Sequence, residues 1–401
     1  MNVSITPSVA AGEVSAPPSK SVAHRLLICA GLSEGASVID NIGTNDDITA
    51  TISCLRALGA EIEINGTTAR VTGASLKEKV TQKDFDCNES GSTLRFMIPV
   101  SMLFAQKCRF TGRGRLMQRP QSVYKELFTE KDCYLRSDDN GLYVGGELKS
   151  GVFRIPGDVS SQFFTGLMFA LPLLEGDSEI ILTTELQSAP YVDITIDALK
   201  KFGVIIEKNE QGFYIKGNQK YKSCNLSVEG DWSNAAFLEA FNLAGGSVNV
   251  NGLNPLSFQG DKICQEFYKK LCEGTPVLDI SQYPDLGPVL MVCAVLKNGA
   301  KLTGTDRLKI KESDRGTAMA QEFKKFGVNV ELGEDYIIIP DCVPQKPTEA
   351  IDCHNDHRIA MSFSVLCSVT GGILKDAQCV NKSYPDFFKD IKNLGIQYEI
   401  I

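Results

Sequence analysis

The chain has 401 residues, of which 43% are hydrophobic and 22% are charged, and its formal net charge at pH 7 is -8. This length allows two or three globular domains, and the acidic balance argues against general nucleic-acid binding, which requires a basic surface. Because the sequence contains no apolar run of about 18 residues and no signal peptide, we expect a cytoplasmic protein that does not bind a membrane.

Cysteine and histidine are not spaced as metal ligands. The 13 cysteines are scattered without a C-x-x-C pair, and there are 3 histidines. We therefore expect reduced thiols that pack as small hydrophobic residues. The glycine-rich phosphate-binding loops of nucleotide-binding proteins are absent as well. The sequence predicts no metal and no other cofactor.

The first predicted helix begins with two cations and a hydroxyl. Two prolines precede Ser19, which is positioned to cap a helix, and the apolar face that follows stops at Gly31. Lys20 lies in the first turn of this helix, and Ser21 and Arg25 lie on one face. Because a cation at a helix start is favourable beside an anion, the segment predicts a phosphate or carboxylate site, with a solvated basic face as the alternative.

A unit recurs along the chain: an amphipathic helix that ends at a glycine, an alternating strand, a polar turn and a second strand. Copies are expected at residues 52–71, 127–144, 196–216, 313–340 and 388–401, with a sixth, weaker copy that ends at Gly274. Blocks of roughly 70 residues are longer than solenoid repeats and indicate duplicated supersecondary units. The sequence therefore predicts an α/β or α+β protein made of about six similar pieces.

Several predicted helices open with capping residues and carry a cation close by. The cations are Arg95, Arg119, Lys311, Arg315, Arg358 and Lys382. Taken singly, each segment reads as a structural cap. Together, in an acidic chain, they predict a cleft for small anionic ligands.

Three later segments supply groups for acid–base chemistry. Asp285 stands in a rigid turn after a proline, and residues 309–315 and 355–358 mix both charges at helix starts. Carboxylates held beside cations can take up or give protons during a reaction. The structural alternative for each segment is a capping box with surface ion pairs.

These motifs resemble those of the 5-enolpyruvylshikimate-3-phosphate synthases, an enolpyruvyl transferase family, over essentially the whole chain. They are P-S-K-S (18–21) with Arg25, G-S-T-L-R (91–95), Q-R-P (118–120), S-S-Q (160–162), P-Y (190–191), Y-P-D (283–285), K-E-S-D-R (311–315), N-D-H-R (355–358) and K-S-Y-P-D (382–386). The resemblance implies two similar domains, each of three βαβαββ repeats in an inside-out α/β barrel, with the active site in the interdomain cleft. It places residues 1–18 with 231–401 in one domain, and 19–230 in the other.

The resemblance also implies the reaction and its residues. The enolpyruvyl group of phosphoenolpyruvate passes to the 5-hydroxyl of shikimate 3-phosphate by addition and elimination, in a monomer. Asp285 is implied as the general base, and Glu312 as the proton donor to the methylene carbon, with Lys20 and His357 as competitors. The implied phosphoenolpyruvate ligands are Lys20, Gly91, Arg119, Gln162, Arg315, Arg358 and Lys382, and those of shikimate 3-phosphate are Ser21, Arg25, Ser160, Ser161, Gln162, Ser188, Tyr191, Asp285 and Lys311.

Two positions depart from the family pattern, and two other functions are possible. Glu89 and Arg307 stand where many relatives have Asn, so neither is expected to be a ligand. UDP-N-acetylglucosamine enolpyruvyl transferases share the repeats, but they have Asn after the first Lys and a reactive Cys in a loop that here, at residues 112–120, contains none. A non-catalytic protein that binds phosphorylated metabolites would lack the acid–base groups.

Overall fold

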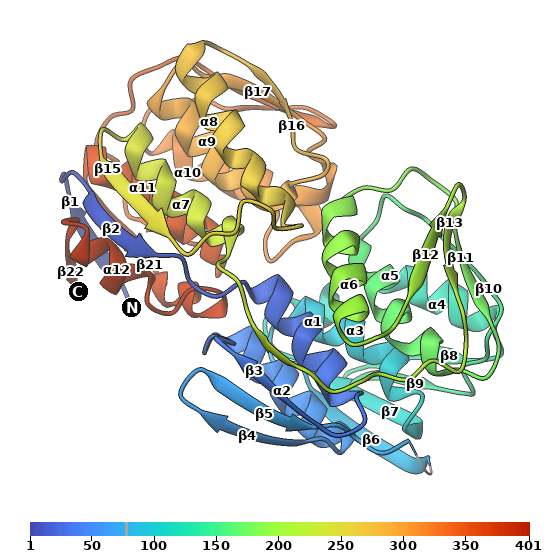
Figure 1. Ribbon diagram of the computed structural model, residues 1–401. Coiled ribbons are helices and arrows are strands. Elements are labelled where there is room, and N and C mark those ends of the chain that lie inside the picture. The colour runs from blue at the N-terminus through green and yellow to red at the C-terminus, as the bar shows by residue number, and fades with distance from the viewer. Residues whose placement is uncertain (77–78) are drawn as a thin grey trace. The chain divides into compact units, whose positions relative to one another are not determined.

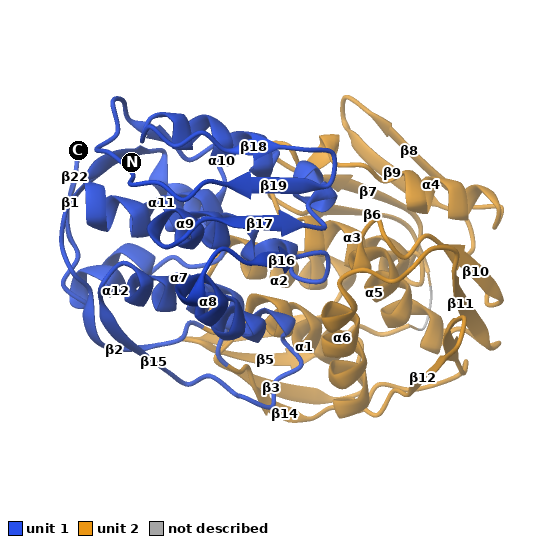
Figure 2. Cartoon of the chain, turned by 90° about the horizontal axis from the view of Figure 1, so that it is seen from above, with its two compact units in different colours: residues 1–17, 230–401 blue, residues 18–229 orange. Residues whose placement is uncertain are grey.

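The computed structural model describes residues 1–76 and 79–401, and the chain divides into two compact units (Figure 2). Unit 1 comprises Met1–Pro17 and Gly230–Ile401, and unit 2 is the continuous segment Pro18–Glu229. The family resemblance places the two crossings after residue 18 and after residue 230. That each unit is a separate enolpyruvyl transferase domain stays a prediction.

Unit 2 contains three blocks of similar build. The first has α1 (Lys20–Gly31), β3 (Ala36–Asp40), α2 (Asp46–Leu58), β4 (Glu61–Asn65) and β5 (Thr68–Thr72). The second has β6 (Val80–Asp86), α3 (Gly91–Ser101), β7 (Ala105–Thr111), α4 (Ser122–Thr129), β8 (Tyr134–Asp138) and β9 (Gly141–Gly145). The third has β10 (Val152–Ile155), α5 (Ser161–Ala170), β11 (Ser178–Leu182), α6 (Ala189–Lys201), β12 (Ile206–Asn209) and β13 (Gly212–Ile215), and β14 (Asn225–Ser227) follows.

Each block of unit 2 forms a four-stranded sheet with the same order of pairing. The sheets are β6-β7-β9-β8, β10-β11-β13-β12 and β14-β3-β5-β4. In each, the first pair is parallel and the next two pairs are antiparallel. A parallel pair requires a crossover, which a helix supplies, whereas an antiparallel pair closes through a short turn. The expected repeat of alternating strands and helices is therefore confirmed in unit 2.

Unit 1 repeats this pattern less completely. Its elements are β1 (Val3–Thr6), β2 (Ala11–Ser15), α7 (Trp232–Leu243), β15 (Ser247–Asn251), α8 (Cys264–Glu273), β16 (Val277–Asp279), α9 (Gly287–Leu296), β17 (Ala300–Thr303), α10 (Arg315–Lys324), β18 (Glu331–Leu332), β19 (Tyr336–Ile339), β20 (Ile351–Asp352), α11 (His357–Thr370), β21 (Gly372–Lys375), α12 (Phe387–Asn393) and β22 (Gln397–Ile400). Two sheets, β16-β17-β19-β18 and β20-β21-β1-β22, have four strands, but β15 pairs with β2 alone. The weak sixth copy is thus a shortened block, because α8 leads directly into β16 of the next one.

The central helices of each unit are buried around their circumference. Nearly every residue of α3, α5, α9 and α11 is buried, as expected of helices that are apolar on all sides and lie in a core. Figure 1 shows the sheets of unit 2 on its outside, with α1, α3 and α5 enclosed between them. The polar residues of these helices are therefore concentrated at their first turns.

The thirteen cysteines are free thiols, and most of them lie in the two cores. In residues 1–76 and 79–401, no helix is both long enough and apolar enough to span a lipid bilayer.

Candidate active site

In unit 1, three cations converge on the carboxylate of Asp285, which lies in the short helix η4 (Pro284–Leu286) just before α9. Its Oδ1 lies 3.1 Å from Lys311 Nζ and 2.8 Å from Arg315 Nη1. Its Oδ2 lies 3.1 Å from Arg358 Nη2. The three sequence segments proposed for acid–base chemistry therefore meet at one carboxylate.

Arg315 ties this cluster into the core of unit 1. Its side chain is 1% exposed, and it binds Glu312 Oε2 at 2.7 Å and Asp356 Oδ2 at 2.9 Å. Asp356, which is fully buried, also caps α11 by accepting from Arg358 N at 3.0 Å, and it accepts from Ser313 Oγ at 3.0 Å. The alternative of surface ion pairs is wrong here, because these pairs are buried and link α10 to α11.

The charges of the cluster shift one another's pKa values. Burial alone raises the pKa of Asp285, but Arg358, Lys311 and Arg315 outweigh it and hold that pKa well below its usual value. Burial lowers the pKa of Lys311 to about 8, although Asp285 opposes this shift. Asp285 is therefore ionised while these three cations face it.

Two further predicted site cations of unit 1, Arg358 and Lys382, lie at the start of α11 and in the short helix η6 (Ala377–Lys382). Arg358 Nη1 donates to Ser233 Oγ at 2.8 Å and to the carbonyl oxygen of Asp285 at 3.2 Å. Lys382 Nζ donates to the carbonyl oxygen of Asn355 at 2.7 Å. His357, the first residue of α11, is buried. The later cationic motifs thus surround the segment that caps α11.

In unit 2, helix α1 begins at Lys20 as predicted, although the Ser19 side chain makes no capping hydrogen bond to it. Lys20 Nζ is 2.8 Å from Asp47 Oδ2 on α2. Arg25 is 3% exposed, and its guanidinium donates to Thr195 Oγ1 at 2.8 Å and to the carbonyl oxygen of Tyr191 at 3.0 Å. The alternative of a solvated basic face is wrong for Arg25, because its buried side chain turns inward and joins α1 to α6.

A second polar group of unit 2 lies at the starts of α3 and α5. Arg95 Nη1 donates to Gln162 Oε1 at 2.7 Å, and Gln162 Nε2 donates to Ser92 Oγ at 2.9 Å. The Arg119 guanidinium lies so close to Gly91 that a Cβ there would collide with it. Glycine at this position therefore lets a cation lie against the first turn of α3.

The hydroxyls proposed for shikimate 3-phosphate lie at helix starts of unit 2. Ser160 caps α5 and accepts from Gln162 N at 3.4 Å, and Ser161 is the first residue of that helix. Ser188 precedes α6 with a φ of 57°, in the left-handed region. A serine with this φ is uncommon and carries backbone strain, which is often found at binding sites. Tyr191 lies in the first turn of α6.

Sequence reasoning missed several partners of these residues. Asp47 lies in the first turn of α2, and Asp356 is the N-cap of α11. The sequence suggests only a capping role for both, and it does not reveal that Asp47 pairs with Lys20 and Asp356 with Arg315. Of the two departures, Arg307 is buried and helps lower the pKa of Lys311, after burial itself. Glu89 places its carboxylate beside Gly114.

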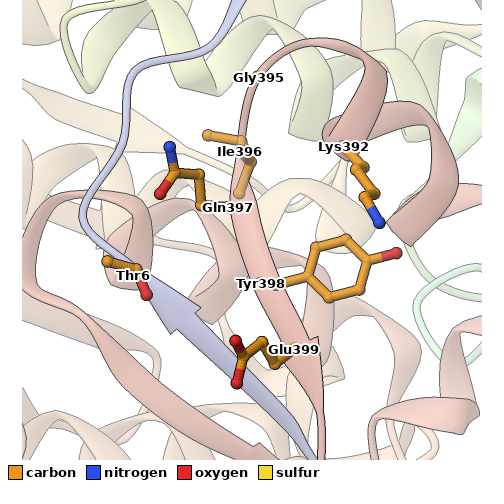
Figure 3. Close-up of a pocket in the computed structure, with 7 residues that line it drawn as sticks. All are labelled: Thr6, Lys392, Gly395, Ile396, Gln397, Tyr398 and Glu399. Atoms are coloured by element: carbon orange, nitrogen blue, oxygen red, sulfur yellow. The ribbon is translucent and has the colours of Figure 1, made fainter.

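Neither a metal-ligand cluster nor the pocket at the end of the chain's last strand is found among these charged groups in residues 1–76 and 79–401. Within residues 1–76 and 79–401, no three His, Cys, Asp or Glu residues are placed to hold a metal ion. A pocket of about 350 Å³ is lined by Thr6, Lys392 and residues 395–399 at the edge strand β22 (Figure 3). It shares no residue with either charged group.

The chain is similar to known proteins over almost all of its length. A model of the family EPSP synthase (3-phosphoshikimate 1-carboxyvinyltransferase) matches residues 6–391. Proteins named 3-phosphoshikimate 1-carboxyvinyltransferase from Clostridium perfringens and Clostridium novyi are each 43% identical, with 98% of this chain covered and 98% and 97% of theirs.

Solved structures agree with this fold. An EPSP synthase from Acinetobacter baumannii superposes with a TM-score of 0.79 at 22% identity, covering 99% of both chains. At that identity the match bears on the fold alone, and it confirms the predicted α/β architecture of repeated units. The family model and the clostridial relatives extend the likeness to the sequence, and the chain belongs to the EPSP synthase (3-phosphoshikimate 1-carboxyvinyltransferase) family.

Proposed function

We propose that the charged groups of both units carry out the reaction of this family, in which the enolpyruvyl group of phosphoenolpyruvate is transferred to the 5-hydroxyl of shikimate 3-phosphate and phosphate is released. Both substrates carry several negative charges. Preorganised cations stabilise such substrates and the charge that develops during addition and elimination. We further propose that the chain acts as a cytoplasmic monomer without a cofactor.

The residues that we propose to bind phosphoenolpyruvate are cations at helix starts and in adjoining turns, together with one glutamine and one glycine. The proposed ligands are Lys20, Gly91, Arg119, Gln162, Arg315, Arg358 and Lys382. The contacts of Arg119 with Gly91 and of Arg95 with Gln162 support this set for unit 2, because they hold polar groups at the starts of α3 and α5.

Shikimate 3-phosphate is assigned to hydroxyls and cations at the starts of α1, α5 and α6, together with two charged residues of unit 1. The proposed ligands are Ser21, Arg25, Ser160, Ser161, Gln162, Ser188, Tyr191, Asp285 and Lys311. The bonds of Arg25 to α6 support an orienting role, since they fix its guanidinium relative to Tyr191.

Asp285 is the proposed general base for the 5-hydroxyl. Its low pKa makes it a weak base while Lys311, Arg315 and Arg358 are directed at it. When substrate anions bind these same cations, less positive charge remains for Asp285, and its pKa rises towards the range in which it accepts a proton. The base is therefore activated by substrate binding.

Glu312 is the proposed proton donor to the methylene carbon, with Lys20 and His357 as the other candidates. The Glu312 carboxylate is partly exposed and is held in place by buried Arg315. The His357 ring, in contrast, is buried. Exchange of solvent deuterium into the methylene group of phosphoenolpyruvate distinguishes the three candidates. Replacing the residue that donates the proton by an uncharged one should slow this exchange, and replacing either of the others should not.

The observation that carries the proposal is the convergence of Lys311, Arg315 and Arg358 on Asp285. Phosphate release from phosphoenolpyruvate tests it, with shikimate 3-phosphate or UDP-N-acetylglucosamine as the acceptor and with or without a chelator. We expect release with shikimate 3-phosphate alone, unaffected by the chelator. Release with the nucleotide sugar, or none with either acceptor, would contradict the proposal.

A further inference from the structure

A buried carboxylate that has no role in the proposed mechanism interacts with Arg358. Asp261, in the short helix η3 (Gly260–Ile263), is 4% exposed and is hydrogen-bonded to Ser233 in the first turn of α7. Ser233 Oγ also accepts from Arg358 Nη1 at 2.8 Å, and Arg358 Nη2 binds Asp285. A serine hydroxyl has one proton to donate and two lone pairs, so Ser233 can serve both neighbours at once.

The surroundings of Asp261 make its charge costly. Burial and then the charge of Asp285 raise the pKa of Asp261 to about 6, against the opposing effects of Arg358 and the Ser233 hydroxyl. Asp231 adds a further negative charge. Tyr283 and Cys264 also interact with Asp261, and burial raises the pKa of each, so both are neutral near pH 6.

We propose that Asp261 is a positioning residue for the enolpyruvyl transfer, acting through Ser233 to fix the Arg358 guanidinium against Asp285. This inference rests on the proposed function, in which Arg358 binds phosphoenolpyruvate and Asp285 is the base. Ionised Asp261 accepts the Ser233 proton, so the lone pairs of Ser233 face Arg358. A guanidinium held at one nitrogen presents its other edge in a fixed direction.

The arrangement has a cost that a purely structural role would not require. Two carboxylates, Asp261 and Asp285, lie near one guanidinium, and Asp261 is ionised at neutral pH although it is buried. Unfavourable charge arrangements of this kind concentrate at functional sites. When Asp261 takes up a proton, the preference for one orientation of Ser233 is lost and Arg358 is held less firmly.

Kinetics of Ser233 variants test the relay. Ser233→Ala should raise KM for phosphoenolpyruvate about 10-fold, because Arg358 loses an acceptor that orients it, with a much smaller change in KM for shikimate 3-phosphate. Ser233→Thr keeps the hydroxyl and should restore a KM near that of the wild type. A purely structural serine would not separate the two substrates in this way.

The pH profile tests Asp261 itself. In the wild type, kcat/KM for phosphoenolpyruvate should fall as pH drops through about 6, where Asp261 takes up its proton. Asp261→Asn should lack this break, and at about pH 8 it should show the KM that the wild type reaches at about pH 5.

Glu239→Gln is the matched control. Glu239 lies on α7, the helix that carries Ser233, and burial raises its pKa as it does that of Asp261, but Glu239 binds Gln265 and Cys264 of α8 instead. It should leave KM and the pH profile unchanged. An Asp261→Asn enzyme with the wild-type KM and break, or a Ser233→Ala enzyme with unchanged KM, overturns the inference. Failure of the proposed function is seen separately, as a wild type that releases no phosphate.

Discussion

At the scale of single residues, Asp285 binds three cations and is also the proposed general base. Asp285→Asn keeps the size and removes the basic carboxylate, so kcat should fall about 10²- to 10⁴-fold while substrate affinity changes much less. Steady-state phosphate release measures both quantities. Asp279→Asn, on β16, is the control and should leave kcat unchanged. An Asp285→Asn enzyme with normal kcat would exclude Asp285 as the base.

Arg315 and Arg119 differ in burial, and their removal should differ accordingly. Arg315→Ala leaves Glu312, Asp356 and Asp285 without a shared cation in the core, so it should lower the free energy of unfolding by about 3–5 kcal/mol. Arg119 lies half-buried against Gly91. Arg119→Ala should reduce kcat/KM with little effect on unfolding. Urea denaturation of both variants checks this, and equal losses of stability would contradict it.

The pKa of Lys311 predicts how kcat/KM for shikimate 3-phosphate changes at alkaline pH. Its pKa is about 8, so free Lys311 loses its positive charge as pH rises through that value. Binding of shikimate 3-phosphate should weaken over the same range, seen as a fall in its kcat/KM. Lys311→Arg stays charged and should shift this fall to higher pH. If both enzymes lose activity at the same pH, another group titrates.

Much of this cluster could be foreseen from the sequence, but its pairing could not. Asp285, Lys311 and Arg315 stand in motifs whose charges are visible along the chain. The ion pair of Asp356 with Arg315 was not predicted, because a carboxylate just before a helix is normally interpreted as a cap. Asp356 is both the cap of α11 and the partner of Arg315. Asp261 gave no signal, since its role depends on Ser233, which lies 28 positions before it, as 261 minus 233 gives.

At the scale of elements, a buried chain of hydroxyls joins α1, α2 and α3. His24 Nδ1 lies 2.7 Å from Thr51 Oγ1, which lies 2.7 Å from Thr93 Oγ1. Burial lowers the pKa of His24 well below its usual value, so the ring is neutral. Thr51→Val leaves buried polar atoms without their partner and should destabilise the protein by about 1–3 kcal/mol.

Thr49 provides the control for that substitution. It lies on the exposed face of the same helix, and its hydroxyl donates to the carbonyl oxygen of Asn45 at 3.2 Å. Thr49→Val should change the free energy of unfolding by about 0.5 kcal/mol or less. Guanidinium denaturation compares the two variants, and similar values for both would show that the hydroxyl chain adds no stability.

Element boundaries were predictable where local chemistry decides them. Helix α1 begins at Lys20, and α2 ends at Gly59 in the left-handed conformation, as the glycine pattern indicates. In the copy expected at residues 313–340, the first strand covers only Glu331–Leu332, because only these residues pair with β19. Strand length depends on a partner elsewhere in the chain, which alternation alone does not reveal.

At the scale of the whole molecule, the number of blocks could be predicted from the repeats in the sequence. The division of unit 1 between the two ends of the chain could not. Unit 1 takes β1 and β2 from one end of the chain and its remaining elements from the other, with all of unit 2 between them. No local pattern marks a strand whose partners lie in the last part of the chain. The resemblance to a family supplied this division.

Removing the last strand should therefore affect the two units unequally. β22 pairs with β1, register Ile5 to Tyr398, so a chain that ends after Asn393 leaves one side of β1 unpaired. We expect unit 1 to become sensitive to protease while residues 18–229 stay resistant, as identified by mass spectrometry of the fragments. Equal digestion of both parts would show that the units do not fold independently.

The position of β1 between β21 and β22 also orders events on the ribosome. Translation releases β1 first and its two neighbours last, so Val3 and Ile5, which are buried in the finished protein, remain without their partners for almost the whole of synthesis. Unit 2 is continuous and can complete its sheets while the nascent chain is still growing. The sheet of unit 1 that contains β1 is completed only when β21 and β22 pair with it, after all of unit 2 has been synthesised.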